Sequence, residues 1–389
     1  MTITADRTER MIASVDHVFS WFNGGSWQRH HLDPDVADFT FGNPQELPLP
    51  GLVDSLQRNA SPKDKDWFAY KFSEDEPRQV VVETLRRRTG IAFEPEDVAL
   101  TAGAFGALGV TIRALADVGD EVIFLSPPWF FYELMIVSSG ATPVRVRLPG
   151  PDFDLDIDAI AAAITPSTRA IIVNSPNNPS GRIYREPELR ALGDVLRSAS
   201  QRHGRPIALI SDESYNRIVF DGFDFVSPAV HYGPTVTIYT YGKTLLAPGQ
   251  RIGYAALSPD YPDKEALNER IFVQQLAAGW GFPNALLQHA ISDLESLSVD
   301  IGALQARRDR MVPALREMGY EVTRPEGTFY VMARSPDPDD LAFTDRLAAR
   351  GALVLPGTIV ESPGWFRISL TASDAMVERG LEAFRAARA

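Results

Sequence analysis

The chain has 389 residues, of which 44% are hydrophobic and 23% charged, a composition that is typical of folded globular proteins and argues against a disordered or fibrous chain. It contains no cysteine, which excludes disulfides, thiolate metal sites and cysteine nucleophiles. Its 51 acidic and 38 basic residues give a net charge of -13, which argues against nucleic acid or an anionic membrane surface as the main partner.

No apolar run approaches the ~20 residues of a membrane-spanning helix, and the N-terminal residues lack the apolar segment of a signal peptide. We therefore expect a cytoplasmic protein without a membrane partner. No metal site is predicted. At roughly 150 residues per domain, the length suggests two or three domains.

Between about Val98 and Leu257, short runs of β-branched residues alternate with amphipathic helical stretches. This alternation is typical of βαβ units, so it predicts an α/β fold with a mostly parallel sheet and helices on both faces. The strands are expected at 121–125, 143–148, 169–174, 206–211, 235–240 and 253–257. The helices are expected at 103–117, 156–164 and 187–203.

From about Glu265 onward the pattern changes to long helical stretches that run through Ala290 and Arg316. They are followed by short expected strands at 320–324, 328–333, 353–355 and 366–370 and a final helix at 372–387. Residues 1–45 fit neither pattern. The simplest arrangement is a large α/β domain over residues 46–285 and a smaller α+β domain formed by both chain ends, 1–45 with 286–389.

Only five lysines occur, and four of them lie beside or near acidic residues, as surface lysines do. Lys243 differs, because it lies in an uncharged stretch between Thr-Val-Thr-Ile-Tyr-Thr-Tyr-Gly and Thr-Leu-Leu-Ala-Pro-Gly. An isolated lysine is often a long side chain whose stem packs on apolar groups. It is also what an imine-forming lysine looks like, because desolvation keeps the amine nucleophilic near neutral pH.

Polar and aromatic residues follow several expected strands, at the edge where ligands bind in an open α/β sheet. Residues 101–108 open a helix with small side chains, so their amides could approach a phosphate, although small residues are common at helix starts. Trp129 is explained equally well by stacking on a flat ligand and by core packing. Residues 174–181 have the composition of a turn, in which two asparagine amides could also donate to a ligand oxygen.

Charged side chains are placed in the same way. Asp212 ends an apolar strand, where a carboxylate is costly unless it meets a cation, either a structural partner or a protonated ring nitrogen. Thr240 and Arg251 flank Lys243 and suit a dianionic phosphate. Arg367 lies within an apolar strand, where it either forms a structural ion pair or captures a carboxylate through two hydrogen bonds.

The order of these features resembles the class I/II pyridoxal-phosphate-dependent aminotransferases of fold type I, the family of aspartate aminotransferase. The resemblance runs over nearly the whole chain, and its most specific part is the series Asn178-Pro-Ser-Gly, Asp212-Glu-Ser-Tyr215 and Thr240-x-x-Lys243 with Gly249 and Arg251. It implies a large domain with a mostly parallel seven-stranded sheet and a smaller α+β domain. It also implies pyridoxal 5'-phosphate as cofactor and amino transfer from an α-amino acid to a 2-oxo acid through Schiff-base and pyridoxamine-phosphate intermediates.

The resemblance assigns roles to individual residues. Lys243 is implied to form the imine and to move the substrate's α-proton, and Asp212 to hold the ring nitrogen protonated. Tyr215 and Asn178 are implied to bond the ring oxygen, and Trp129 to stack on the ring. The residues implied for the phosphate are Gly103, Ala104, Phe105, Thr240 and Arg251.

The substrate α-carboxylate is implied to bind Arg367, helped by Asn178 and the amide of Gly42. Tyr70 is implied to reach the cofactor phosphate of the other subunit, so a homodimer is expected. The run after Tyr70, Lys-Phe-Ser-Glu-Asp-Glu-Pro77, departs from the glycine and Leu-Arg of many relatives. Pro77 is predicted as the first position of a helix.

The same residue set also serves lyases, cyclases or synthases, decarboxylases and oxidative enzymes, so the resemblance fixes the cofactor more firmly than the reaction. Transamination is expected because it needs only the lysine-mediated proton shift. A cofactor-binding sensor domain is disfavoured by the charge of -13. No second arginine for an acidic side chain can be assigned, with Arg29 as a possible exception, so a neutral or aromatic amino acid is the expected donor.

Overall fold

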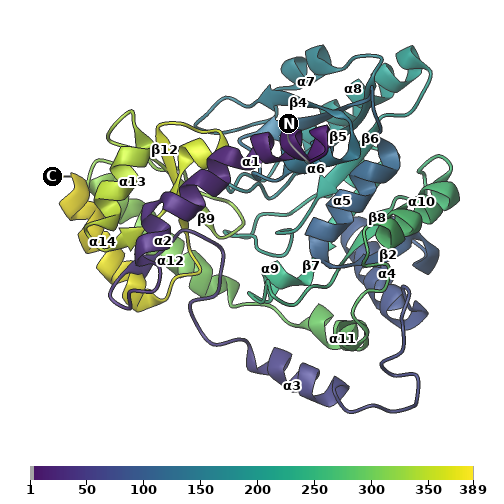
Figure 1. The fold of residues 1–389 in the computed structure, drawn as a ribbon, viewed down its shortest axis with the longest axis horizontal. Helices are drawn as coiled ribbons and strands as arrows, with labels where there is room; N and C mark the ends of the chain where they lie inside the picture. The colour runs from purple at the N-terminus through teal and green to yellow at the C-terminus, as the bar shows by residue number, and fades with distance from the viewer. Residues whose placement is uncertain (1–3, 389) are drawn as a thin grey trace.

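The computed structural model describes residues 4–388, and its largest element is a seven-stranded sheet with the order β2-β8-β7-β6-β5-β3-β4 (Figure 1). Strand β8 is antiparallel to both neighbours, and the other neighbouring pairs are parallel. The predicted α/β class with a mostly parallel sheet is therefore confirmed. The strands are β2 (Val98–Thr101), β3 (Glu121–Ser126), β4 (Thr142–Arg147), β5 (Thr168–Asn174), β6 (Ala208–Asp212), β7 (Thr235–Thr240) and β8 (Gly253–Leu257).

Helices bury both faces of this sheet. Because successive strand residues point to opposite faces, Ala170 and Ile172 of β5 pack in one core and Ile171 and Val173 in another. The first core contains residues of α5 (Gly103–Leu115), α6 (Tyr132–Ser139) and α10 (Lys264–Ala277). The second contains residues of α7 (Ile157–Ala163) and α8 (Glu186–His203).

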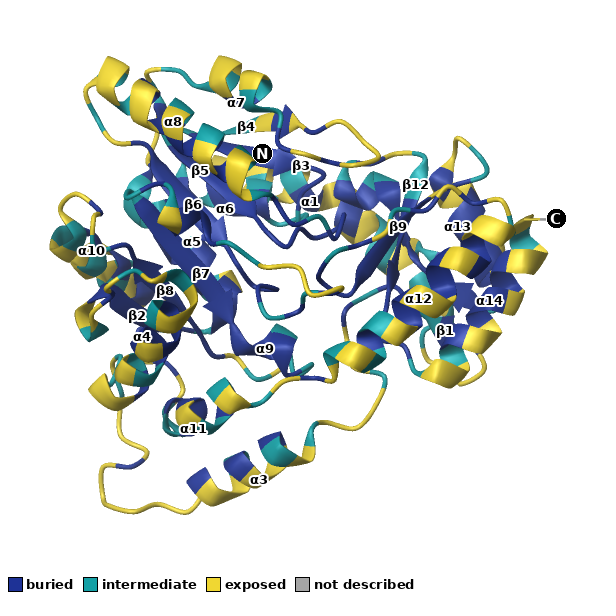
Figure 2. Ribbon diagram, turned by 180° about the vertical axis from the view of Figure 1, so that it is seen from behind, coloured by how far each residue is buried: buried dark blue, intermediate teal, exposed yellow. Residues whose placement is uncertain are grey.

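A third core covers the edge formed by β2 and β8. Val98 and Leu100 of β2 pack there with Tyr254 of β8 and with three helices. These helices are α3 (Pro50–Asn59), α4 (Asp75–Thr89) and α11 (Ala285–Ser296). Helix α3 lies on α11 at the margin of the molecule, between two extended segments (Figure 2). Pro77 is the third residue of α4 rather than the first, which is a correction, although it still lies in the first turn where proline is tolerated.

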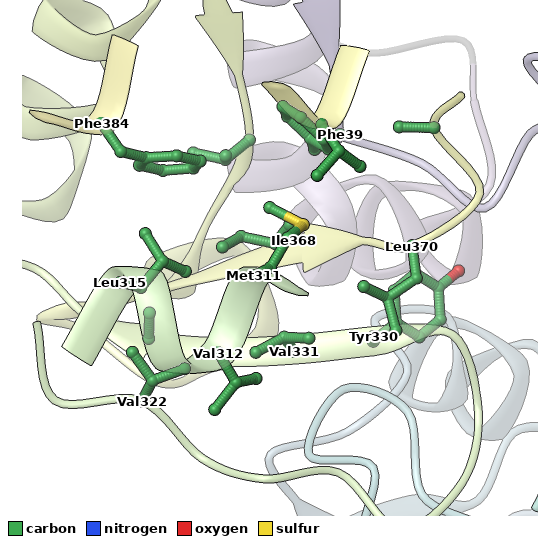
Figure 3. Packing of buried hydrophobic residues seen from close by; sticks show 14 of the residues in the cluster. Phe39, Met311, Val312, Leu315, Val322, Tyr330, Val331, Ile368, Leu370 and Phe384 are labelled. Atoms are coloured by element: carbon green, nitrogen blue, oxygen red, sulfur yellow. The ribbon is translucent and has the colours of Figure 1, made fainter. Parts of the chain in front are cut away.

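A smaller antiparallel sheet has the order β11-β12-β9. Its core contains Phe39 from the N-terminal part of the chain and Phe384 from the last helix, together with Met311, Leu315 and Ile368 (Figure 3). The elements are β9 (Tyr330–Arg334), β11 (Leu355–Pro356), β12 (Trp365–Ser369), α12 (Ile301–Glu317), α13 (Asp340–Ala348) and α14 (Asp374–Arg388). A separate parallel pair joins β1 (Ala37–Asp38) to β10 (Ala352–Leu353), so segments near both chain ends are paired.

The N-terminal residues form the long helix α1 (Asp6–Gly24) and the short helix α2 (Ser26–His30), which the sequence analysis did not predict. Helix α1 buries only Val15 and Val18, so its apolar stripe is narrow. Val18 packs against Met332 of the smaller sheet, and the helix also lies along α6. It therefore spans from the smaller sheet to the helices of the large one (Figure 1).

Other expected boundaries shift. The strand expected at 320–324 is wrong, because only an isolated bridge from Val322 to Ala333 forms there. The long helical pattern after Glu265 is divided into α10, α11 and α12, and Gly279, with φ +82°, follows the end of α10. Between residues 4 and 388 the chain also forms three short 3₁₀ segments, Pro95–Asp97, Pro228–Val230 and Gly357–Val360.

We propose that the two sheets define two domains, as the sequence suggested with 46–285 and with 1–45 plus 286–389, of which residues 1–3 and 389 lie outside the described part. Because Leu287 and Ile291 of α11 pack in the core beside β2, we propose that the second boundary follows α11. Between residues 4 and 388, no helix is long and apolar enough to cross a membrane.

Candidate active site

Three neighbouring strands, β5, β6 and β7, end at Asn174, Asp212 and Thr240. The short helix α9 (Tyr241–Thr244) follows β7 and carries Lys243. A cavity of about 130 Å³ opens at these strand ends, which is where ligands bind in an open α/β sheet. The residues predicted for the site that line it are Ala104, Phe105, Trp129, Asn178, Asp212, Tyr215, Thr240, Lys243 and Arg251.

The Lys243 side chain is half-buried and lies among aromatic rings. Its Nζ atom lies 5.6 Å from the ring centre of Tyr215 and 5.9 Å from that of Phe329. The Thr240 hydroxyl accepts a hydrogen bond from the Gly242 amide at 3.4 Å and so caps the helix turn that presents the lysine.

Asp212 is buried, and each of its carboxylate oxygens accepts a hydrogen bond. Oδ1 accepts from the Ser214 hydroxyl at 2.6 Å, and Oδ2 accepts from the Tyr132 hydroxyl at 2.6 Å. Burial raises the pKa of this carboxyl, while the two hydroxyls and the nearby Lys243 charge lower it. Sequence reasoning missed Tyr132 and Ser214, although Tyr132 ends the aromatic run that contains Trp129.

The start of α5 forms an open corner beside Arg251. Helix α5 has no side-chain cap, so its first amides are free to meet an anion. The Arg251 guanidinium donates to the main-chain carbonyls of Pro248 at 2.7 Å and Ala102 at 3.2 Å, and burial lowers its pKa. Gly103 has φ +74°, and an added Cβ would lie 2.9 Å from Nη2 of Arg251.

Arg367 projects from β12 of the smaller sheet and is buried. Its Nη1 donates to Oδ1 of Asn178 at 2.8 Å, and its Nη2 donates to the Thr40 carbonyl at 2.9 Å. Its Nε is buried without a hydrogen-bond partner among the described residues. A buried guanidinium with a free donor is costly unless an anion completes its bonding. Burial also lowers the pKa of Arg367.

Tyr330 is a third residue that sequence reasoning missed, since nothing near it in the chain marks it. Its ring centre lies 3.9 Å from the Arg367 guanidinium carbon and 6.0 Å from the ring centre of Tyr215, and its hydroxyl lies beside Gly42. Burial would raise the pKa of Tyr330, but the charges of Arg367 and Lys243 outweigh it and lower the pKa. Burial raises the pKa of Tyr215.

Tyr70 and Gly42 are two predicted residues that do not line the cavity. Tyr70 is 85% exposed and packs on the ring of Phe282 with ring centres 4.9 Å apart, so this chain does not bring it to its own cavity. Gly42, whose amide is expected to meet a substrate carboxylate, lies against Phe329 and the Tyr330 hydroxyl and does not line the cavity. An added Cβ at Gly42 would collide with Phe329 and with the Tyr330 hydroxyl, so this position needs glycine.

Comparison with known families matches residues 34–384 to the model described as "Aminotransferase class I and II". The chain belongs to the class I and II aminotransferases. The aspartate/prephenate aminotransferase of Thermus thermophilus is 33% identical over 360 residues, which cover 90% of each chain. The arginine–pyruvate transaminase of Pseudomonas aeruginosa is 33% identical over 293 residues, 72% of this chain and 71% of that one.

Among solved structures, an aminotransferase from Eubacterium rectale superimposes with a TM-score of 0.90 at 29% identity, covering 99% of this chain and 98% of that one. The protein is therefore a fold type I, pyridoxal-phosphate-dependent aminotransferase, which moves an amino group from an α-amino acid to a 2-oxo acid. Nothing in the comparisons favours the lyase, cyclase or oxidative alternative.

The cavity of this aminotransferase fits its cofactor. The open corner at Gly103 and Arg251 suits a phosphate, because two main-chain carbonyls are the guanidinium's only bonded partners between residues 4 and 388. The buried Asp212 carboxylate suits a protonated ring nitrogen, which would supply the cation that a carboxylate needs there.

Proposed function

We propose that Lys243 attaches the cofactor and, once released by substrate, moves the proton at the substrate Cα. When bound, pyridoxal phosphate supplies an electron-withdrawing ring that accepts the electron pair of the broken Cα–H bond. The position of Lys243, in a cavity with the buried Asp212, is the observation that carries this assignment.

The other cavity residues hold the cofactor in this proposal. Asp212 keeps the ring nitrogen protonated, while Tyr215 and Asn178 donate hydrogen bonds to the ring oxygen and Trp129 stacks on the ring. The phosphate binds the amides of Ala104 and Phe105 beside Gly103, with the Thr240 hydroxyl and the Arg251 guanidinium. With these roles, each charged residue that lines the cavity has a function: Asp212 meets the ring nitrogen, Arg251 meets the phosphate, and Lys243 acts on the reacting atoms.

Arg367 binds the substrate α-carboxylate, and Asn178 orients the guanidinium. The support is the free, buried Nε of Arg367, because a carboxylate at this edge would complete the bonding of the guanidinium. Fixing the carboxylate selects which Cα bond is held in position to break, so Arg367 sets the reaction as well as the affinity. The amide of Gly42, which lies beside the Tyr330 hydroxyl, helps to bind the carboxylate in this proposal.

The amino donor carries a neutral or aromatic side chain in this proposal. The relatives are named for aspartate, prephenate and arginine, so their names do not agree on one donor. The charged residues lining the cavity are Asp212, Lys243 and Arg251, and the remaining wall includes Phe105 and Trp129, whose rings are 5.1 Å apart. Arg29, the possible exception, is bonded elsewhere, because it pairs with Asp345 at 3.4 Å and is 53% exposed.

Tyr70 completes the phosphate site of a second copy in this proposal. This proposal is supported by a cluster of exposed aromatic side chains, in which Tyr70 and Phe72 pack on Phe282. Exposed apolar surface of this kind is typical of a protein–protein interface. A cytoplasmic location stays a prediction.

A single-turnover measurement tests the proposal. The cofactor-loaded protein is mixed with phenylalanine, tyrosine, leucine or aspartate in the absence of any 2-oxo acid, and released 2-oxo acid is quantified. One equivalent per site is expected, with repeated turnover only after a 2-oxo acid is added. The kcat/KM for phenylalanine should exceed that for aspartate by roughly tenfold or more, since a second carboxylate meets no free cation.

The controls separate the parts of the proposal. Lys243→Ala should release no product, whereas Lys65→Ala, at a side chain that is 87% exposed, should behave as the unmodified protein. Repeated turnover without a 2-oxo acid would indicate lyase or oxidase chemistry instead. Aspartate as the best donor would contradict the proposed substrate class while leaving amino transfer intact.

A further inference from the structure

Glu326 joins two segments that belong to different parts of the fold. It lies between α12 and β9, and its side chain is only 16% exposed. Its carboxylate accepts hydrogen bonds from Nη1 of Arg182 at 2.9 and 3.1 Å and from the Ile183 amide at 3.1 Å, and it also pairs with Arg185. All of these donors lie in the segment between β5 and α8, which contains Asn178.

The main chains of the two segments are also in direct contact. The Gly181 carbonyl accepts from the amides of Glu326 at 2.9 Å and Gly327 at 3.1 Å. Gly181 has φ +72°, and a Cβ at this position would collide with Pro325. The close approach therefore requires glycine, because another residue would separate the two segments.

On one side, this junction leads to Asn178. The Asn177 amide donates to the Arg182 carbonyl at 2.8 Å, and the Gly181 amide donates to the Asn177 carbonyl at 2.8 Å. These bonds close a tight turn around Asn178, whose side chain accepts from Arg367. A shift of Arg182 is therefore transmitted to the residue that orients the Arg367 guanidinium.

On the other side, the junction leads to Tyr330. Thr328 is buried and has φ +65°, a backbone conformation that β-branched residues rarely adopt. Its amide donates to the Ile218 carbonyl at 2.9 Å, and its hydroxyl accepts from the Tyr330 amide at 3.1 Å. Such a conformation persists only where the surrounding contacts hold it. The Tyr330 ring in turn lies against Arg367.

We propose that Glu326 is a positioning residue that holds Asn178 and Tyr330 on either side of Arg367 and thereby sets how tightly the substrate α-carboxylate binds. The proposal rests on the proposed role of Arg367. Exposed ion pairs contribute little, but this carboxylate is largely shielded and receives charged donors and a main-chain amide together. Small displacements of a positioning group change reactivity by large factors, so the effect should appear at the carboxylate site.

The test is Glu326→Gln in the cofactor-loaded protein, which keeps the size of the side chain and removes its charge. We expect the KM for phenylalanine to rise roughly tenfold while kcat stays within about twofold, because carboxylate binding is weakened and the chemistry is not. The dissociation constant of 3-phenylpropanoate, an analogue without the amino group, should rise by roughly the same factor in calorimetry. Cofactor content and the thermal midpoint check that the fold is intact.

Two further variants sharpen the result. Glu321→Gln is the matched control, since Glu321 lies five residues away, is 53% exposed and pairs with Arg334 only at 3.7 Å, so it should leave KM unchanged. Arg185→Gln removes one partner of Glu326 and should raise KM in the same direction by a smaller factor, which keeps the proposal testable if Glu326→Gln does not fold.

An active, folded Glu326→Gln protein with unchanged KM and unchanged 3-phenylpropanoate affinity would overturn the proposal. A fall in thermal midpoint and kcat with unchanged KM would also overturn it, because that pattern belongs to a merely structural ion pair. Failure of the proposed function looks different, since the unmodified protein would then release no 2-oxo acid from any amino acid of the panel.

Discussion

Asp212 combines two demands that oppose each other. It lies in a buried position, which disfavours its charged form and raises its pKa, yet its proposed work with the cofactor requires that charge. Hydrogen bonds from Ser214 and Tyr132 offset part of the cost. The cofactor-free protein should therefore be less stable with Asp212 ionised than with a neutral side chain of the same shape.

Asp212→Asn tests this balance. A carboxyl whose pKa is raised in the folded state binds protons more readily than in the unfolded chain, so its stabilising contribution is present at low pH and lost as pH rises. The cofactor-free variant should gain thermal midpoint relative to the unmodified protein, and the gain should be larger at pH 8 than at pH 5. With cofactor bound, turnover should fall by about 100-fold or more. Equal midpoints at both pH values, or near-normal kcat, would contradict the assignment.

Single residues could be predicted from the sequence where a local signal marks them. Lys243 is the one lysine in an uncharged stretch, and Asp212 and Thr240 end apolar strands, so their place at the sheet edge follows from strand order. Tyr132 contacts Asp212 across 80 positions in the chain, and nothing near it indicates this partner. Tyr330 depends in the same way on distant parts of the chain, Tyr215 after β6 and Arg367 in the neighbouring strand β12.

At the scale of elements, the beginning of α5 forms the proposed phosphate site. Gly103→Ala adds a Cβ that would lie 2.9 Å from Nη2 of Arg251 at a residue with φ +74°, so Arg251 and the helix start must move apart. We expect cofactor affinity to fall by roughly tenfold or more, measured by equilibrium dialysis.

Gly109→Ala is the control within the same helix. Nothing lies within 4 Å of an added Cβ there, so the change should leave cofactor affinity intact and stabilise α5 by up to about 1 kcal/mol in denaturant unfolding. Equal losses of affinity in both variants would show that helix stability, rather than the corner at Arg251, controls cofactor binding.

Most strands of the large sheet were predictable, because apolar or β-branched runs mark them, almost fully buried in β5 to β8 and interspersed with exposed residues in the edge strand β4. Strands β3 to β8 appear within two residues of their expected limits, and α8 within one. Helix α1 was not predictable, since it buries only Val15 and Val18 and its sequence reads as polar. Residues 320–324 have a strand-like composition, but within this segment only Val322 forms a β-bridge. Whether such a segment becomes a strand depends on a neighbouring strand to pair with, which its composition does not show.

At the scale of the whole molecule, the single chain leaves Tyr70 85% exposed beside Phe72 and Phe282. Light scattering should give twice the 42.9 kDa of one chain. Tyr70→Phe should leave this mass unchanged and raise the dissociation constant of the cofactor by roughly tenfold, because in the proposed dimer the hydroxyl donates to the other subunit's phosphate. A monomeric mass would contradict the homodimer, and an unchanged constant would contradict the role of Tyr70 alone.

The pairing of β2 with β8 joins residues 98–101 to residues 253–256, with Val98 opposite Ala256. During synthesis on the ribosome, the proposed phosphate site at the start of α5 therefore cannot form until Arg251 and β8 have been synthesised. Arg367 leaves the ribosome still later, by several seconds at roughly 5–20 residues per second. Within one chain, every residue proposed to hold the cofactor is thus synthesised before Arg367, so the cofactor pocket can form before the site for the substrate carboxylate.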